Sequence, residues 1–360
     1  MTRNRWFAAA LGATLVALAA APAQAGTWDE VLAAAKKEGK VVLGTNLGMP
    51  KFRQDVTRKF KARYGIDVEL RSMRGSELTA VARRECSANR PSMDVLLSGN
   101  SEITRLYPKG CLREMKSNLL LPSVTDGKQW RGGALKWNDP EHKYMLQLIE
   151  YVNVSGIYNT TRLKAEEIDS VKHLLEPRLK GKIASYDPRR GGAGKGAASF
   201  FLAMLGDEYV VNLYKGQEVV YTANHRQLAD WIARGVYSVG LGAVARQFDP
   251  LRKKGLPIGV VRFKDLPGKL TGGSGVIKLV KGAPNPNGAV VLLNWLADQE
   301  GQQVFERHVR QKSRRLDVNE GLDDYVLPKE GVQYHDDYAY EFYTKERPRA
   351  RKRLVELLGR

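Results

Sequence analysis

The sequence predicts an α/β protein built from two doubly wound units. Helical and strand-like patterns alternate over residues 28–101, and a second alternating series occupies about 151–270. An N-terminal leader of 25 residues would leave a mature chain of 335, which is long enough for two hydrophobic cores. Hydrophobic residues at 43% and charged residues at 27% are typical of a globular protein, so no fibrous or disordered class is indicated.

The first 25 residues have the pattern of an export signal. Arg3 and Arg5 form a charged start, residues 6–21 are almost wholly apolar, and Ala23-Gln24-Ala25 is a typical cleavage sequence. The apolar run is short for a membrane span, so a retained anchor is the less favoured alternative. We therefore expect export, with cleavage after Ala25.

The formal net charge of +19 falls to +17 without Arg3 and Arg5. Such an excess suits anionic ligands, membrane surfaces or nucleic acid. The basic residues are scattered rather than gathered with aromatic residues, and the chain is expected to be exported, so we expect no nucleic-acid partner. Cys86 and Cys111 are the two cysteines. In an oxidising compartment they are expected to form a disulfide, the alternative being two buried thiols.

The first unit is expected to contain six elements before residue 101. They are helices over 28–37, 52–64 and 77–85, and strands over 40–43, 66–70 and 93–97. Ligands of doubly wound sheets bind beyond the carboxyl ends of the strands. Three loops have that position: Thr45-Asn46, Arg74-Gly75-Ser76 and Ser98-Gly99-Asn100. Plain turns are the alternative, because turns use the same residue types.

The second unit begins after a β-rich stretch over 143–158, which is long enough for more than one strand. Its expected strands are 183–186, 219–221 and 236–241, and its expected helices are 164–176, 197–205, 207–215 and 226–233. Gly206 is expected to end the helix before it. Three further elements follow: a strand over 276–280, a helix over 287–307 and a terminal amphipathic helix over 349–358.

A basic glycine-rich loop, Arg189 to Gly196, joins the strand at 183–186 to the next helix. Glycines let backbone N–H groups approach a ligand, and a helix N-terminus carries a partial positive charge. The loop is thus a candidate cradle for an anion. The alternative is a solvated basic turn.

Patterns that would indicate catalysis do not fit. The P-loop pattern fails because Arg189 stands where its first glycine belongs and Gly196 where Ser or Thr belongs. The nucleophile pattern G-x-S-x-G fails at Val276. The five histidines lack metal-ligand spacing, and no carboxylate pair is evident. We expect no catalytic activity, no cofactor and no metal site. An exported hydrolase or transferase remains a third hypothesis.

Several stretches resemble the periplasmic solute-binding proteins of ABC importers. The similarity is to the two-lobed family that includes iron(III), thiamine, polyamine and phosphonate or sugar-phosphate binders. The stretches lie at 28–43, 93–100, 152–159, 179–188, 229–242 and 272–305. This resemblance implies a type II periplasmic binding protein fold, with a hinge and a ligand cleft between the lobes. It also implies a membrane permease partner and periplasmic location, and we expect a monomer.

The resemblance divides the chain into segments. Residues 1–25 would be the leader, 26–150 the first lobe and 151–270 the second. Residues 271–312 would return to the first lobe, and residues 313–360 would pack on the second. The extended crossings between the lobes are expected near 148–153 and 268–273.

The iron(III) branch of the family implies a ligand set that this chain lacks. The histidine of the first loop is replaced by Thr45-Asn46, and the acid after the third strand by Ser98-Gly99-Asn100. Ala245 and Arg246 stand where two tyrosines are expected. Ferric ion or a ferric chelate is therefore the alternative ligand, not the favoured one.

The resemblance implies that the part of the iron(III) branch's site that holds a small anion is retained. It corresponds to Gly191-Gly192-Ala193 and Asn224, and Arg246 and Arg190 could add contacts to a carboxylate, phosphate or phosphonate. Arg74 and Tyr151 complete the predicted ligand-binding set. The sequence thus predicts the binding component of an ABC importer for a small anionic organic solute.

Overall fold

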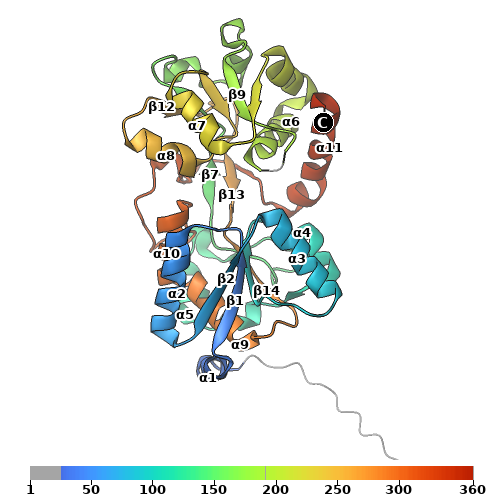
Figure 1. The fold of residues 1–360 in the computed structure, drawn as a ribbon, viewed down its shortest axis with the longest axis vertical. Helices are drawn as coiled ribbons and strands as arrows, with labels where there is room; N and C mark the ends of the chain where they lie inside the picture. The colour runs from blue at the N-terminus through green and yellow to red at the C-terminus, as the bar shows by residue number, and fades with distance from the viewer. Residues whose placement is uncertain (1–25, 191, 360) are drawn as a thin grey trace, which may run out of the picture.

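The computed structural model describes residues 26–190 and 192–359. The expected leader and Gly191 lie outside these residues. The protein consists of two α/β lobes stacked along its long axis, and extended strands run between them (Figure 1). The predicted fold class, with two lobes and a hinge region, is confirmed.

The first lobe contains a seven-stranded mixed sheet. Its order is β2-β1-β3-β14-β6-β5, and β4 also pairs with β14. β1 is parallel to β2 and β3, whereas β14 is antiparallel to β3. The strands are β1 (Lys40–Thr45), β2 (Asp67–Ser72), β3 (Val95–Ser98), β4 (Leu112–Arg113), β5 (Lys136–Trp137), β6 (Leu146–Gln147) and β14 (Val276–Val280).

The helices of the first lobe follow the predicted boundaries closely up to residue 87. They are α1 (Trp28–Glu38), α2 (Pro50–Tyr64), α3 (Gly75–Ser87), α4 (Glu102–Arg105), α5 (Pro122–Thr125), α9 (Pro286–Ala297) and α10 (Gln299–Val309). Thr27 and Glu30 form a capping box at the start of α1. α1 and α2 end at Gly39 and Gly65, each in the left-handed conformation that glycine adopts without strain.

The single helix expected over 287–307 is wrong, because the structure has two helices there. The backbone of Asp298 is extended, with φ −78° and ψ 167°. Its carboxylate accepts hydrogen bonds from Ser123 Oγ at 3.0 Å and Arg63 Nη1 at 3.3 Å. Contacts with distant segments therefore favour a break that helical periodicity does not reveal.

The second lobe contains a five-stranded sheet in the order β10-β9-β11-β8-β12. Its strands are β8 (Gly156–Asn159), β9 (Ile183–Tyr186), β10 (Val220–Thr222), β11 (Val239–Leu241) and β12 (Ile258–Val260). Its helices are α6 (Ala193–Val211), α7 (His225–Ala233), α8 (Ala245–Lys253) and the C-terminal α11 (Arg347–Leu358), which packs beside α6 (Figure 1). Helix α6 starts earlier than predicted, and Gly206, at φ 83°, breaks its helical geometry.

The helix expected over 164–176 is also wrong. Two short 3₁₀ turns, Ala165–Glu167 and Val171–Leu175, occupy this stretch. The carboxylate of Asp265 accepts hydrogen bonds from the backbone N–H of Val171 at 3.0 Å and from Ser170 Oγ at 2.6 Å. These local side-chain hydrogen bonds compete with the backbone bonding of an α-helix, so they favour the 3₁₀ turns over the predicted helix.

Three strands form a small sheet between the lobes, in the order β15-β13-β7. They are β7 (Tyr151–Asn153), β13 (Lys269–Thr271) and β15 (His335–Asp336). β7 and β13 occupy the two predicted crossings, whereas β15 was not anticipated. Residues 312–315 still bond to the first lobe, and Tyr325 packs into the core of the second. The exact lobe boundaries given above stay a prediction.

Cys86 at the end of α3 and Cys111 before β4 form a disulfide. The predicted pairing is confirmed. It ties α3 to the segment that enters β4, at the edge of the first lobe's core, where Cys111 is buried.

Candidate functional site

The loop after β1 contributes polar groups that are held by the protein itself. Thr45 is fully buried, and its Oγ1 accepts a hydrogen bond from Leu47 N at 3.1 Å. Asn46 Nδ2 donates to Ser274 Oγ at 3.1 Å, which joins this loop to the glycine-rich segment after β13. The Oδ1 atom of Asn46 is buried and has no hydrogen-bond partner among the described residues. Asn46 is thus the member of this pair with a polar atom left for a ligand.

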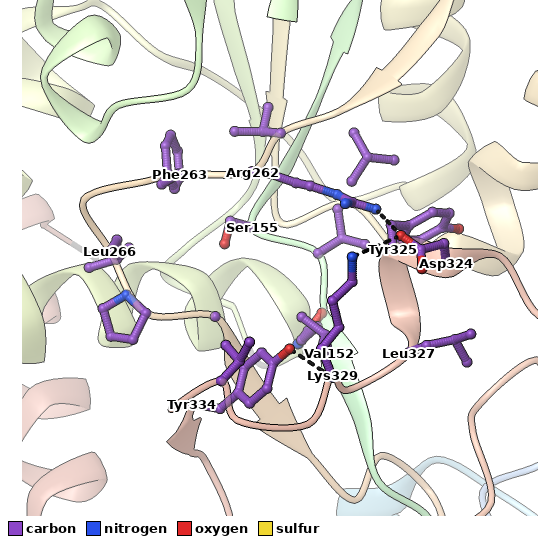
Figure 2. A pocket seen from close by; sticks show the side chains of 17 residues that line it. Val152, Ser155, Arg262, Phe263, Leu266, Asp324, Tyr325, Leu327, Lys329 and Tyr334 are labelled. Carbon is purple, nitrogen blue, oxygen red and sulfur yellow. Dashed lines mark hydrogen bonds and ion pairs between the residues drawn. The ribbon is translucent and has the colours of Figure 1, made fainter. Parts of the chain in front are cut away.

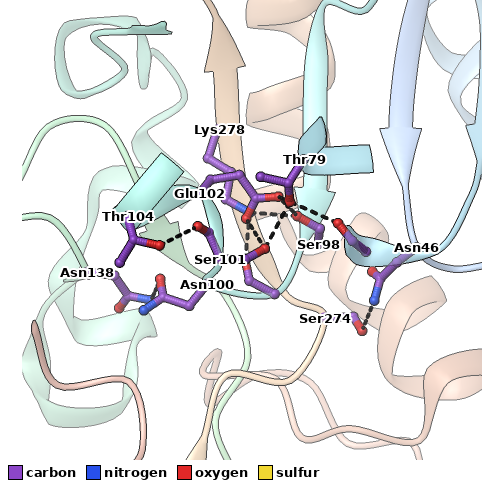
Figure 3. A network of polar contacts seen from close by, with 12 residues as sticks. Asn46, Thr79, Ser98, Asn100, Ser101, Glu102, Thr104, Asn138, Ser274 and Lys278 are labelled. Atoms are coloured by element: carbon purple, nitrogen blue, oxygen red, sulfur yellow. Dashed lines mark hydrogen bonds and ion pairs between the residues drawn. The ribbon is translucent and has the colours of Figure 1, made fainter. Parts of the chain in front are cut away.

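The loop after β3 lies on a buried ion pair (Figure 3). Lys278 of β14 and Glu102 of α4 are both completely buried, with Nζ and Oε2 3.2 Å apart. Lys278 Nζ also donates to Ser98 Oγ at 2.8 Å and to the carbonyl oxygen of Gly99 at 2.7 Å. Asn100 accepts a bond from Asn138 Nδ2 at 3.0 Å. Ser98, Gly99 and Asn100 are therefore brought together, but their polar groups bind mainly within the protein.

Lys278 was not anticipated from the sequence, although there was a signal. It is the one charged residue in the apolar strand Val276–Val280, where alternation cannot place it in solvent because every residue of β14 is buried. Burial lowers the pKa of Lys278, and the charge of Glu102 opposes that effect. By contrast, the predicted site residue Arg74 is exposed at the start of α3, apart from this network.

The glycine-rich loop places the start of α6 against the sheet of the second lobe. Gly192 precedes the helix with φ 108°, a conformation that other residues rarely adopt. A side chain at Gly194 would collide with the carbonyl oxygen of Tyr186, and one at Gly242 would meet the Cα of Gly194. The glycines thus permit close backbone packing. Among the described residues no side chain caps α6, so its first backbone N–H groups, beginning at Ala193, stay available at the positive end of the helix.

The two arginines of this loop do not behave alike. Arg189 binds Asp187 through Nε at 2.9 Å and Nη2 at 3.0 Å. The side chain of Arg190 is 66% exposed, and its Nε lies 3.6 Å from Asp187 Oδ2. Asn224, the other predicted anion contact, accepts bonds from the backbone N–H groups of Arg226 and Gln227 and so caps α7. The Oδ1 atom of Asn224 is therefore already hydrogen-bonded, so a bound anion would have to accept a hydrogen bond from its Nδ2 atom.

An aromatic pair that the sequence analysis did not select lies beside the start of α6. The rings of Tyr186 and His225 stack with centroids 3.7 Å apart and an angle of 9° between their planes. Burial, followed by the positive charge of Arg246, lowers the pKa of His225 from 6.5 to about 4. The imidazole is thus neutral at neutral pH, and its buried Nδ1 has no hydrogen-bond partner among the described residues.

The crossing strand β7 brings Tyr151 close to Arg246. Both border a crevice of about 70 Å³, together with Ala245 and Gln311. Gln311 Nε2 donates to Tyr151 Oη at 3.3 Å, and Gln311 Oε1 accepts from Ser274 N at 3.1 Å. Burial raises the pKa of Tyr151 to about 12, with the charge of Arg246 acting in the opposite direction. Tyr151, Ala245 and Arg246 are thus brought together, and Gln311 joins them to the loop of Asn46 through Ser274.

Arg246 stands at the start of α8, which no side chain caps. Helix α8 begins at Ala245, only three residues after Gly242, the residue that packs on α6. Two helix N-termini, one guanidinium, one neutral imidazole and one neutral phenol therefore lie in one region between the lobes. Such a set offers hydrogen-bond donors and positive charge, the features that anion recognition requires.

Acid is expected to destabilise the protein through His225. The pKa of this histidine is lower in the folded protein than in the unfolded chain, so the unfolded state binds more protons between pH 6.5 and 4. Above pH 6.5 the imidazole is neutral in both states, and its contribution to the free energy of unfolding is fully present. As the pH falls from 6.5 toward 4, the free energy of unfolding should fall by about 2 kcal/mol, after allowance for the partial exposure of the ring.

Urea unfolding between pH 4 and 7.5 measures this effect. His225→Phe keeps a ring for Tyr186 to stack on and should show a shallower loss of stability in acid than the wild type. His142→Asn, at an exposed position with φ 55°, is the matched control and should follow the wild type. Superimposable profiles for His225→Phe and the wild type would contradict the assignment.

A larger cavity of about 260 Å³ lies beside the crossing strands on the side of the second lobe (Figure 2). Val152, Phe263, Leu266 and Tyr334 are among the residues that line it. At one edge Arg262 and Lys329 approach the carboxylate of Asp324, at 3.2 and 3.6 Å. None of the predicted site residues that the structure describes borders this cavity.

Among residues 26–190 and 192–359, no group of three or more His, Cys, Asp or Glu residues could hold a metal ion. Within the same ranges, no helix combines the length and apolar character that crossing a membrane requires.

The profile of the bacterial extracellular solute-binding proteins matches residues 44–303, which extend over both lobes. The chain belongs to this family. This solute-binding protein is therefore a transport component, located outside the cytoplasmic membrane, and its family implies a small-molecule ligand and the permease of an ABC importer as partner. An uncharacterized protein of Haemophilus influenzae is 24% identical to it over 268 residues, which are 70% of this chain and 71% of that protein.

Solved structures of periplasmic binding proteins share the fold of this solute-binding protein. AfuA of Actinobacillus pleuropneumoniae with fructose-6-phosphate bound has a TM-score of 0.66 and 19% identity, covering 89% of this chain and 98% of that one. Iron-bound HitA of Pseudomonas aeruginosa also scores 0.66, with 16% identity over 87% and 98%. A Trichodesmium protein in complex with iron and citrate scores 0.64, with 18% identity over 89% and 99%.

Proposed function

We propose that this protein captures a small anionic organic solute between its lobes and delivers it to the permease of an ABC importer. A phosphate- or phosphonate-bearing compound is favoured over a carboxylate. The proposal includes export with removal of the leader after Ala25 and action as a monomer. The mechanism is capture without chemical change: donors of the second lobe hold the anion, and closure of the lobes excludes water.

The observation that carries this proposal is the position of Arg246. Its guanidinium belongs to the uncapped start of α8, borders the crevice with Tyr151, and lies close enough to His225 to lower the pKa of that imidazole. The uncapped start of α6 adds backbone N–H donors to the same lobe. A guanidinium can bind a phosphate through two parallel hydrogen bonds, and helix N-termini favour the same ligands.

Two features of similar proteins bear on the choice of ligand. AfuA contains fructose-6-phosphate, which has the chemistry proposed here. The Trichodesmium protein contains iron with citrate, so a ferric chelate, itself an anion, is the second candidate. In this chain Thr45-Asn46, Ser98 and Ala245-Arg246 occupy the positions where the resemblance implies ferric ligands, which favours the organic anion over the bare metal.

Thermal unfolding of the mature protein, residues 26–360, tests the proposal. Fructose 6-phosphate, 2-aminoethylphosphonate, citrate and ferric citrate serve as probes. A phosphate or phosphonate that binds should stabilise the protein by about 2.7 kcal/mol at a concentration one hundred times its Kd. Stabilisation by ferric citrate alone would support the second candidate. Turnover of a probe would favour the third hypothesis, an enzyme.

Replacing Arg246 with glutamine is expected to weaken binding of the stabilising anion by about 10- to 100-fold, because a charge-assisted hydrogen bond contributes about 1.5–3 kcal/mol. The control is Arg234→Gln, which changes an exposed arginine at the C-terminal end of α7, the end away from His225. This variant should leave the Kd unchanged. Calorimetric titration of the two variants and the wild type measures both values. Equal affinities for Arg246→Gln and the wild type would remove Arg246 from the site.

A further inference from the structure

The C-terminal segment from β15 to α11 contacts both lobes. Tyr338 packs into a hydrophobic cluster of the first lobe that includes Ile103, and its Oη donates to the carbonyl oxygen of Gly273 at 2.7 Å. Leu354 and Leu358 of α11 pack into the core of the second lobe, and α11 lies along α6 with its first turn directed toward α3 and α4 (Figure 1). The segment therefore lies at the side of the interlobe space.

This segment brings two arginines into a cluster of positive charge. Arg347 lies over the ring of Tyr343, with its Cζ 4.5 Å from the ring centroid, and its Nη1 is 3.4 Å from Asp337 Oδ2. Arg351 follows one helical turn later. Burial, then the charge of Arg347, lowers the pKa of Arg351, and the charge of Arg105 on α4 of the first lobe acts in the same direction.

Helix α6 carries Lys195 in its first turn and packs along α11, which carries Arg351. Burial and then the charge of Arg351 lower the pKa of Lys195, and the charge of Asp187 acts in the opposite direction. Asp337 is the acid that pairs directly with the cluster, through Arg347, while Glu102, which lies close to Tyr343, is engaged by Lys278. The charge of Arg347 thus disfavours the charged form of Arg351, and that of Arg351 disfavours the charged form of Lys195, whereas Arg347, despite its burial, is stabilised by Asp337. A bound anion would relieve the repulsion on Arg351 and Lys195.

Unpartnered donors are a second observation that points to a ligand. The Nε atoms of Arg347 and Arg351 are buried, and within the described residues neither has a hydrogen-bond acceptor. Buried N–H groups in native proteins almost always have one. Arg347 is held by the ring of Tyr343 and the carboxylate of Asp337, so it positions the cluster. Within the described residues, the guanidinium of Arg351 makes no hydrogen bond or ion pair with another side chain.

We infer that Lys195, Arg347 and Arg351 form a second oxyanion subsite beside the start of α6. Lys195 follows Gly194 directly, so this subsite adjoins the helix start on which the proposed anion site is built. The solute then carries two anionic groups, as a phosphorylated carboxylic acid or a sugar bisphosphate does. This inference rests on the proposed function, and it names the class of solute that the site accepts.

Calorimetric titration of the mature protein with inorganic phosphate tests the subsite. The wild type should bind two phosphates. Arg351→Gln should keep only the phosphate at the Arg246 site, and Arg246→Gln should keep only the phosphate at the second subsite. Lys352→Gln, an exposed neighbour on α11, is the matched control and should bind two. The melting temperature of unliganded Arg351→Gln should not fall below that of the wild type, since the substitution removes a repulsive charge. This comparison separates lost binding from lost folding.

A second titration compares 3-phosphoglycerate, which has two anionic groups, with glycerol 3-phosphate, which has one. The wild type should prefer 3-phosphoglycerate, and Arg351→Gln should reduce that preference at least tenfold. One phosphate bound by the wild type, lost in Arg246→Gln and unchanged in Arg351→Gln, would overturn the second subsite and leave the proposed function standing. No phosphate bound by the wild type would count against both.

Discussion

Replacing Lys278 with methionine is expected to lower the free energy of unfolding by about 3–5 kcal/mol. The substitution leaves the carboxylate of Glu102 fully buried without its partner at 3.2 Å. It also removes the hydrogen bonds from Nζ to Ser98 Oγ and to the carbonyl oxygen of Gly99. Urea unfolding followed by tryptophan fluorescence measures the loss.

Two further variants make the result specific to the buried pair. Lys281→Met, just beyond the end of β14, changes an exposed lysine and should cost less than about 0.5 kcal/mol. The double variant Lys278→Met with Glu102→Gln should recover part of the loss, since neutralising both partners leaves no isolated charge in the core. A loss for Lys278→Met no larger than that for Lys281→Met would contradict the role of the pair.

Removing the disulfide by the double substitution Cys86→Ala and Cys111→Ala is expected to lower the stability of the protein by about 3 kcal/mol. The bond joins residues 25 positions apart, and opening a loop of that length increases the conformational freedom of the unfolded chain. Alanine is used in place of serine because serine would bury a hydroxyl at position 111, where the native side chain is only 3% exposed.

Denaturation with and without a thiol reductant tests this expectation. Reductant should shift the wild type toward the midpoint of the alanine variant, and the variant itself should not respond. Coincident curves for the wild type under both conditions and for the variant would show that the cross-link contributes nothing to stability.

Local signals were sufficient for the first six elements of the first lobe, from α1 to β3. The helices expected over 28–37 and 52–64 end within one residue of α1 and α2, which the left-handed Gly39 and Gly65 terminate. Local signals were sufficient there because a left-handed turn is a property of one residue and its neighbours. The same reasoning failed at Asp298 and Ser170, where contacts with Arg63 and Asp265 override helical periodicity.

The candidate site was only partly accessible from the sequence. The start of α6 was selected because a glycine-rich loop before a helix has a local pattern, and Arg246 because the resemblance places it where a tyrosine ligand is expected. Tyr186 and His225 were not selected, although they stack at 3.7 Å, because 39 positions separate them and neither has a motif. Gln311 was missed for the same reason: its contact with Tyr151 crosses from the end of α10 to β7.

The sequence by itself determined the alternating elements of two α/β lobes, which depend on periodicity and on backbone preferences within a few residues. The crossings at β7 and β13 came from the resemblance to two-lobed binding proteins, and the loops of the candidate site from their positions at strand ends. Only the tertiary structure decided that Lys278 pairs with Glu102, 176 positions away, and that α11, which carries Arg351, packs along α6, which carries Lys195. Such pairs arise from strand order and helix packing, which bring together charges whose separate positions in the chain contain no sign of the contact.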